Sequence, residues 1–225
     1  EDSLKRLQSD YIDLYQIHGF DSQTPMVETL ETLDLLVKSG KVRYIGCSNL
    51  AAWQIMKALG ISSQRYLSKF VSLQAYYTIA GRDIEREIVP LLQDQNMGLL
   101  VWSPLAGGFL SGKYSRKNSV TEGRRANYDF PPIDKEKAYD IIDVIEPIAE
   151  NKKSSVAQIA LAWLLHQPVV TSVILGVRKP EQLRDNLKSI DVELTIDELR
   201  RLNQVSELSP EYPGWMINLQ AGERQ

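Results

Sequence analysis

The sequence predicts an α/β protein in which a parallel β-sheet is assembled from repeated strand–helix units. Short apolar segments rich in β-forming residues recur along the chain, and amphipathic helical patterns lie between them. The first four apolar segments begin at residues 11, 42, 70 and 98, a spacing that suits one helical crossover between parallel strands.

Five segments are expected to be strands, because each is short and mostly apolar, as strands covered on both faces are. They are residues 11–17 (YIDLYQI), 42–46 (VRYIG), 70–74 (FVSLQ), 98–103 (GLLVWS) and 169–176 (VVTSVILG).

The segments between the strands show the apolar periodicity of amphipathic helices. The apolar faces consist of Met26, Leu30, Leu33 and Val37; of Ile84, Ile88, Leu91 and Leu92; of Ile141, Ile145 and Ile148; and of Val156, Ile159, Ala160, Trp163 and Leu164. The first helix is expected to have Thr24 as its N-cap and Pro25 as its first residue. Capping-box spacing occurs in two pairs, Ser155 with Gln158 and Thr195 with Glu198.

A doubly wound sheet and a (β/α)₈ barrel both fit this pattern. The lack of a G-x-G-x-x-G after any expected strand disfavours a dinucleotide-binding doubly wound sheet. A barrel needs eight strand–helix units, and this sequence accounts for about five of them. The barrel interpretation therefore expects the chain to supply strands 4–8, with the N-terminal units upstream in a longer protein. Residues 114–134 are expected to form an excursion loop, and residues 208–225 an irregular C-terminal tail.

The composition narrows the function classes. The 225 residues include 26 Lys and Arg against 29 Asp and Glu, and 43% are hydrophobic, enough for one large domain over residues 1–225. The net charge of −3 argues against a nucleic-acid-binding surface. The best apolar run, residues 97–110, is interrupted by Ser103 and Pro104, so no membrane partner is expected. The single cysteine, Cys47, fits a cytoplasmic location.

Polar and aromatic residues follow the expected strands. In a barrel, function lies at the carboxyl ends of the strands. Those positions hold His18, Ser48, Asn49, Gln74, Trp102, Ser103 and residues 176–178. Together these groups predict a small-molecule site of mixed polarity.

Several motifs in a fixed order resemble the aldo-keto reductase family. They are SLKRLQSDYIDLYQIHGFD at residues 3–21, GCSNL at 46–50, QAYY at 74–77, SPLAGGFLSGKY at 103–114 and GVRKPEQLRDNL at 176–187. The fourth motif is similar to the branch that contains bacterial reductases and potassium-channel β subunits. The resemblance implies a (β/α)₈ barrel that binds NADP(H) and transfers a hydride to the carbonyl of an aldehyde or ketone.

The resemblance assigns a role to each residue that matches a family motif. His18 matches the histidine of the catalytic tetrad, which hydrogen-bonds the substrate carbonyl. Ser48, Asn49 and Gln74 match the residues that hold the nicotinamide carboxamide, and side-chain amides can both donate and accept. Trp102 matches the aromatic side chain that stacks on the nicotinamide ring.

The remaining matched residues are assigned to the phosphates and the adenosine. The segment that folds over the pyrophosphate corresponds to Ser103, Pro104, Leu105, Gly107, Ser111, Gly112 and Lys113. The adenosine end corresponds to Gly176, Arg178, Gln182, Asp185 and Asn186. Arg178 is the expected partner of a 2′-phosphate, which favours NADP over NAD. The spacing of Gln182, Asp185 and Asn186 places them on one helix face, where they could converge on one ligand.

The family's tetrad also contains an Asp, a Tyr and a Lys, and no segment here resembles the stretches that carry them. Because the tyrosine would be the general acid, we expect this chain alone not to turn over substrate. Two alternatives stay open: a cofactor-binding regulatory subunit similar to potassium-channel β subunits, and a folded piece without catalysis.

Other reactive or aromatic residues are interpreted as structural. Cys47 is expected to fill the core, and His166 to cap the end of a helix. Trp53 and Trp163 are expected to pack. Arg124 and Arg125, in the long loop, are expected to be solvated, with a contact to the cofactor phosphates as the less favoured alternative.

Overall fold

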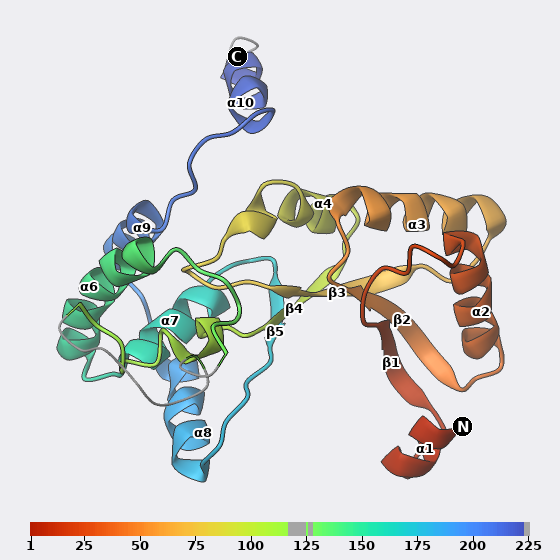
Figure 1. Ribbon diagram of the computed structural model, residues 1–225, viewed down its shortest axis with the longest axis horizontal. Helices are drawn as coiled ribbons and strands as arrows, with labels where there is room; N and C mark the ends of the chain where they lie inside the picture. Colours follow the sequence, from red (N-terminus) through yellow and green to blue (C-terminus); the bar gives the residue numbers. More distant parts are fainter. Residues whose placement is uncertain (117–124, 126–127, 223–225) are drawn as a thin grey trace. The chain divides into compact units, whose positions relative to one another are not determined.

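The computed structural model describes residues 1–116, 125 and 128–222. These residues form a five-stranded sheet in which every neighbouring pair is parallel and the strand order is β1-β2-β3-β4-β5 (Figure 1). Strands in sequential order, each joined to the next by a crossover, form the wall of a barrel, whereas a doubly wound sheet reverses its strand order. The barrel alternative is therefore the correct one.

The five strands lie where the sequence predicts them, with small shifts at their ends. They are β1 (Ile12–Ile17), β2 (Val42–Ser48), β3 (Phe70–Tyr76), β4 (Gly98–Trp102) and β5 (Val170–Val173). β5 is shorter than predicted because it pairs only with residues 99–101 of β4. The prediction that each strand is covered on both faces is wrong for β5, because its central residues Thr171 and Ser172 are exposed.

Contacts divide the chain into two compact units. Unit 1 consists of Glu1–Tyr76, Glu87–Trp102 and Pro168–Val173, and unit 2 of Tyr77–Arg86, Ser103–Gln167 and Ile174–Gln225. Unit 1 contains the whole sheet, and unit 2 contains most of the C-terminal helices. The expectation of a single domain stays a prediction.

Unit 1 also contains the helices α1 (Asp2–Leu7), α2 (Met26–Lys38), α3 (Ala52–Arg65) and α4 (Ile88–Asp94), of which α2 packs on β2 and on α3, and α3 packs on α4. Its core contains Leu30, Ile45, Ile55, Leu73 and Leu99, each at most 1% exposed. The predicted start of α2 is one residue off, because Pro25 is its N-cap. The Thr24 hydroxyl donates instead to Asp21 in the preceding turn. The predicted helix around Ile84 is also divided, since Ile84 lies in a separate turn, η1 (Asp83–Glu85).

Asp34 is a buried carboxylate that ties α2 to the segment before β3. Its side chain is 5% exposed and pairs with Lys38 at 2.6 Å. Its Oδ1 accepts from the backbone N–H of Ser68 at 2.8 Å. The Lys38 ammonium and the Ser68 N–H hold the pKa of Asp34 below its ordinary value.

We expect Asp34→Asn to lower the free energy of unfolding at neutral pH by about 1–3 kcal/mol, because a hydrogen-bonded charge is lost in a buried site. A depressed pKa contributes stability above the unfolded value of about 3.9, and that stability is lost as pH falls through the folded pKa. The difference in free energy of unfolding between wild type and Asp34→Asn should therefore become smaller below about pH 4.

Urea titrations at several pH values between neutral and acid measure this difference. Asp13→Asn, at a 73% exposed side chain, is the control, and an equal pH dependence in both variants would contradict the assignment.

Unit 2 is built mainly from helices. They are α6 (Lys135–Lys152), α7 (Val156–Leu165), α8 (Pro180–Leu187), α9 (Ile196–Val205) and α10 (Gly214–Gly222), with the turns η1, η2 (Ala106–Gly108) and η3 (Lys188–Asp191). α6 packs on α7 and α9, and α7 packs on α8. Both capping boxes are confirmed, since Ser155 and Thr195 accept from Gln158 and Glu198.

Two predictions about the loops of unit 2 need comment. The prediction of an irregular C-terminal tail is wrong for residues 214–222, which form α10. This helix begins directly after Pro213, and proline is tolerated at a helix start. The excursion loop lies partly outside the described residues.

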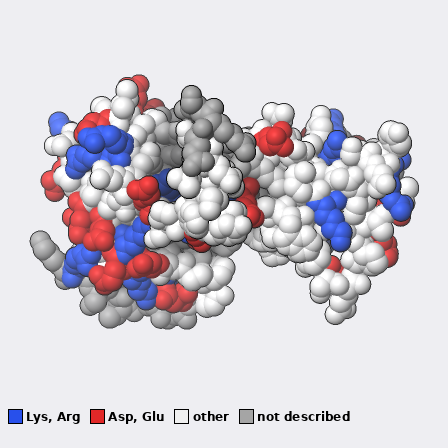
Figure 2. Space-filling model, turned by 90° about the horizontal axis from the view of Figure 1, so that it is seen from above, with Lys and Arg blue, Asp and Glu red and all other residues white. Residues whose placement is uncertain are grey.

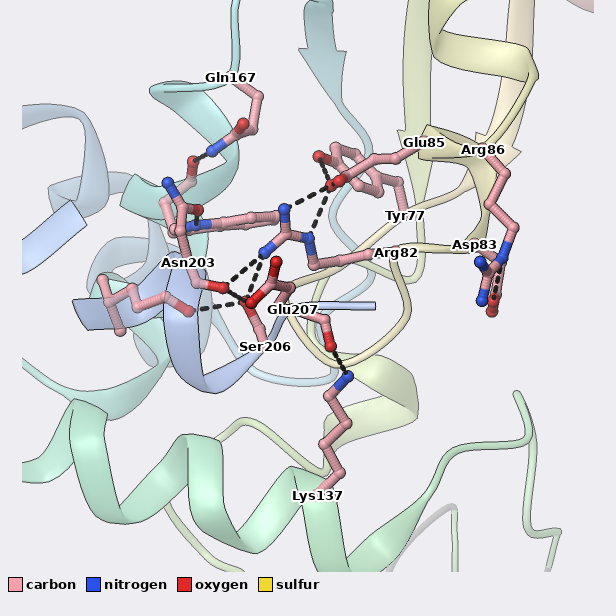
Figure 3. A network of polar contacts seen from close by, with 12 residues as sticks. Tyr77, Arg82, Asp83, Glu85, Arg86, Lys137, Gln167, Asn203, Ser206 and Glu207 are labelled. Carbon is pink, nitrogen blue, oxygen red and sulfur yellow. Dashed lines mark hydrogen bonds and ion pairs between the residues drawn. The ribbon is translucent and has the colours of Figure 1, made fainter. Parts of the chain in front are cut away.

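A polar network joins the segment around η1 to the end of α9 (Figure 3). Arg82 donates to both carboxylate oxygens of Glu85 at 2.7 and 2.8 Å and to the Ser206 hydroxyl at 2.7 Å. The Tyr77 hydroxyl also donates to Glu85, at 2.7 Å, and burial together with this carboxylate raises the pKa of Tyr77. The Arg82 guanidinium lies 5.3 Å from the centre of the buried Trp163 ring. This network fixes a loop to a helix that is distant in the sequence.

The charged surface of unit 2 is mixed in sign. On the face seen in Figure 2, blue and red side chains alternate over the part where Figure 1 places α6 and α9. Arg116, for example, contacts the three α6 carboxylates of Glu136, Asp140 and Asp143. In the described part of the chain, no helix is long and apolar enough to cross a bilayer.

Candidate functional site

The carboxyl ends of the strands in unit 1 bring together residues from distant parts of the sequence. Parallel pairing places Ile17 beside Cys47, Ser48 beside Gln74, and Tyr76 beside Trp102. The residues that follow these pairs therefore leave the sheet at the same edge. His18, Asn49 and Trp102 meet there.

Asn49 links the other two residues through its side-chain amide. Its Nδ2 donates to the backbone carbonyl of His18 at 3.2 Å, and its Oδ1 accepts from the indole N–H of Trp102 at 3.0 Å. The backbone of Asn49 is left-handed, with φ at 57°, a conformation that asparagine tolerates better than most residues. The Asn49 N–H donates to the Gln74 carbonyl at 3.2 Å, which holds this turn against β3.

Ser48 and Tyr76 complete this part of the site. The buried Ser48 hydroxyl donates to the Gln74 carbonyl at 2.9 Å. The Tyr76 ring packs against Trp102 with ring centres 5.1 Å apart and fixes the plane of the indole. Tyr76 was not assigned from the sequence, although it lies inside the quoted motif QAYY. The alternation of strand side chains was the signal that could have identified it, because Gln74 and Tyr76 share a face.

These groups retain hydrogen-bonding capacity for a ligand. A side-chain amide has two N–H donors and two acceptor lone pairs, and Asn49 uses one of each in the two bonds above. Gln74 and Trp102 are both half-buried, so each presents part of its surface. The donor set fits a planar carboxamide attached to a flat ring.

The second group of predicted residues lies in unit 2, in a tight turn after β4. Ser103, Ala106, Gly107 and Gly108 all have positive φ, from 50° to 96°. The Ser103 hydroxyl accepts from the Gly107 N–H at 2.9 Å and closes the turn. Pro104 is buried, Leu105, Gly107 and Ser111 are half-buried, and Gly112 and Lys113 are exposed.

The third group surrounds α8. Gly176 and Arg178 are exposed, and the Gln182 side chain accepts from the backbone N–H groups of Arg178 and Lys179 at 2.9 and 3.3 Å. Asn186 is buried.

The carboxylate of Asp185 faces α7. Asp185 accepts from the Ser155 hydroxyl at 2.8 Å and from the Gln158 amide at 2.7 Å. Gln182 thus bonds the backbone just before α8, whereas Asp185 bonds Ser155 and Gln158 at the start of α7, and the role of both residues in binding stays a prediction.

The residues interpreted as structural give mixed outcomes. Cys47 is buried as predicted, and burial raises the pKa of its thiol to about 12. His166 is the C-cap of α7, and Trp163 is fully buried. Trp53, expected to pack, meets the ring of Phe20 edge-on with ring centres 6.3 Å apart but is 61% exposed, so it packs at the surface and not in the core.

Arg125 corrects a further prediction. Its side chain is 3% exposed rather than solvated, because backbone carbonyls and Asp129 surround the guanidinium. Arg124 lies outside the described residues.

Comparison with known proteins gives a consistent result. Residues 1–207 match the family described as "Aldo/keto reductase family". The chain is 39% identical to the uncharacterized oxidoreductase YrpG of Bacillus subtilis, covering 91% of this chain and 61% of that protein. It is 33% identical to a probable voltage-gated potassium channel subunit beta of Arabidopsis thaliana, covering 94% of this chain and 66% of that protein.

A solved structure shows the same fold. The crystal structure of a thermostable aldo-keto reductase, Tm1743, in complex with the inhibitor epalrestat aligns with a TM-score of 0.70 at 30% identity. The alignment covers 91% of this chain and 63% of that one. The chain therefore spans a little over three fifths of the length of these similar proteins.

Proposed function

The chain belongs to the aldo/keto reductase family, and from that premise we propose that it binds NADPH and serves the reduction of an aldehyde or ketone carbonyl. Its fold is of the (β/α)₈ barrel type with a parallel five-stranded sheet. We further propose that this sheet corresponds to strands 4–8 of such a barrel.

One observation carries the proposal: Asn49 bonds both His18 and Trp102 at the carboxyl edge of the sheet. An amide held in this way can bind a carboxamide with its remaining donor and acceptor, and the indole offers a face for the attached ring. The same bonds hold the backbone of His18, whose exposed imidazole can hydrogen-bond a carbonyl oxygen.

The predicted residues of unit 2 suit the phosphates and the adenosine end of NADPH. The exposed Lys113 can donate to phosphate oxygens and supplies a positive charge. In the turn at residues 103–108 the N–H groups of Ala106, Gly107 and Gly108 bond within the turn, so the turn contributes a close approach of its backbone to the phosphates rather than these three donors. Arg178 is exposed and can pair with a 2′-phosphate in the forked geometry of a guanidinium. When bound, NADPH supplies the hydride, and the residues named here bind and orient.

We expect Trp102→Phe to weaken NADPH binding about tenfold, because the variant keeps a ring but loses the hydrogen bond that orients Asn49. Isothermal titration calorimetry with NADPH, and with NADH as the weaker ligand, measures this. Trp53→Phe removes an exposed indole from the same unit and serves as the control. If wild type binds no NADPH, or if both variants bind alike, the proposal is wrong.

Turnover is a separate matter, because only His18 of the four tetrad residues is matched in this sequence. We expect the chain alone to bind NADPH without oxidising it rapidly in the presence of an aldehyde.

A regulatory subunit is the second candidate function, and the similarity to the Arabidopsis channel subunit favours it. Co-purification with a membrane partner, altered by NADPH, would support that candidate.

A further inference from the structure

Arg125 is a buried cation that no assigned role explains. Its Nη1 donates to the backbone carbonyls of Ala106 at 2.7 Å and Pro131 at 2.9 Å. Its Nη2 donates to the carboxylate of Asp129, and its guanidinium lies 5.7 Å from the centre of the Phe109 ring. With a side chain only 3% exposed, Arg125 is enclosed by protein groups, and within the described residues these satisfy three of its five N–H donors.

The bond to Ala106 reaches the most unusual backbone in unit 2. Ala106 has φ at 50° although it is not a glycine, and Gly107 and Gly108 follow at 65° and 96°. Successive residues with positive φ are unfavourable for an alanine unless surrounding groups hold them. The Arg125 guanidinium holds the Ala106 carbonyl, and the Ser103 hydroxyl holds the Gly107 N–H.

The same cation also joins the turn to the segment that follows it. Pro131 lies beside Gly107, since an added Cβ at Gly107 would meet the Phe130 carbonyl oxygen at 2.4 Å and Pro131 at 3.2 Å. Lys135 pairs with Asp129 at 2.8 Å and holds the other side of the carboxylate. The turn and residues 129–131 are therefore fastened to each other through Arg125.

We propose that Arg125 is a positioning residue for the pyrophosphate: it holds the turn at residues 103–108 in the shape that meets the phosphates, without touching them. This inference rests on the proposed function, in which that turn binds the pyrophosphate of NADPH. It differs from a direct phosphate contact, because the guanidinium is buried against carbonyl oxygens and a carboxylate.

The test compares two ligands by isothermal titration calorimetry. NADPH contains the pyrophosphate, whereas adenosine 2′-phosphate reaches only the adenosine end. We expect Arg125→Ala to weaken NADPH binding at least tenfold and to leave adenosine 2′-phosphate within about twofold of wild type. Arg125→Lys should recover part of the NADPH affinity, because a lysine keeps the charge and can reach some of the acceptors.

Arg116→Ala is the matched control, because this arginine is 43% exposed and contacts carboxylates of α6. Its NADPH affinity should stay within about twofold of wild type. If Arg125→Ala does not fold, the ratio of the two affinities in Arg125→Lys decides by the same criterion. An equal loss for both ligands shows a merely structural role, and no loss for NADPH shows no role; either overturns the inference. If wild type itself binds no NADPH, the proposed function fails and this inference fails with it.

Discussion

Arg82→Ala should lower the free energy of unfolding by about 3–5 kcal/mol, because it leaves a mostly buried carboxylate without its cation. Arg82 is 14% and Glu85 is 24% exposed, so water compensates little for the lost pair. The variant also removes the donor to Ser206 and the cation above the Trp163 ring. Chemical denaturation followed by circular dichroism measures the change.

Two further variants separate charge from packing at this network. Arg200→Ala breaks an exposed pair on α9, with side chains 69% and 63% exposed, and should cost less than about 1 kcal/mol. The double change Arg82→Met with Glu85→Met should recover much of the loss, because no buried charge then lacks a partner. A loss in Arg82→Ala no greater than in Arg200→Ala would show that the network adds little.

Gly107→Ala should destabilise unit 2 by about 2–4 kcal/mol and weaken NADPH binding, since it combines overpacking with an unfavourable backbone conformation. The new Cβ would lie 2.4 Å from the Phe130 carbonyl oxygen, which is backbone and cannot rotate away. The turn must therefore open or residues 130–131 must move, and both changes disturb the contacts of Arg125.

Gly108→Ala provides the comparison for this prediction. Gly108 has φ at 96°, and an added Cβ there meets nothing within 4 Å. Gly108→Ala should lower the free energy of unfolding only by the cost of a left-handed backbone at an alanine, about 1–2 kcal/mol. Thermal melts and NADPH titrations of the two variants measure the difference. Equal losses would mean that the close approach at Gly107 has no effect beyond backbone strain.

The parts of the fold that follow from local periodicity were predictable. The five strands, the helix faces and both capping boxes depend on the spacing of residues within about a dozen positions. Parallel pairing then placed His18, Asn49 and Trp102 at one edge, as strand ends in a barrel should be.

The parts that failed depend on partners far away in the sequence. Nothing near Arg82 indicates Ser206, which is 124 residues distant. An arginine in a polar segment is exposed by default, and Arg125 departs from this because carbonyls of a turn before it and a proline after it converge on its guanidinium. The role of Asp185 in cofactor binding stays a prediction, but its side-chain partners on α7, which are 27 and 30 residues away, could not be predicted from local spacing.

The contact of Asp185 with Ser155 and Gln158 has an evolutionary consequence. One carboxylate accepts from the capping residue of α7 and from its N3 residue, so these three positions form a single recognition unit between two helices. A change at position 185 removes the side-chain acceptor of both donors at once, and Gln158 then keeps only its bond to the backbone carbonyl of residue 185. Substitutions at these three positions should therefore occur together during evolution. A chimera that exchanges α8 between related sequences should fold stably only when residues 155 and 158 are exchanged as well.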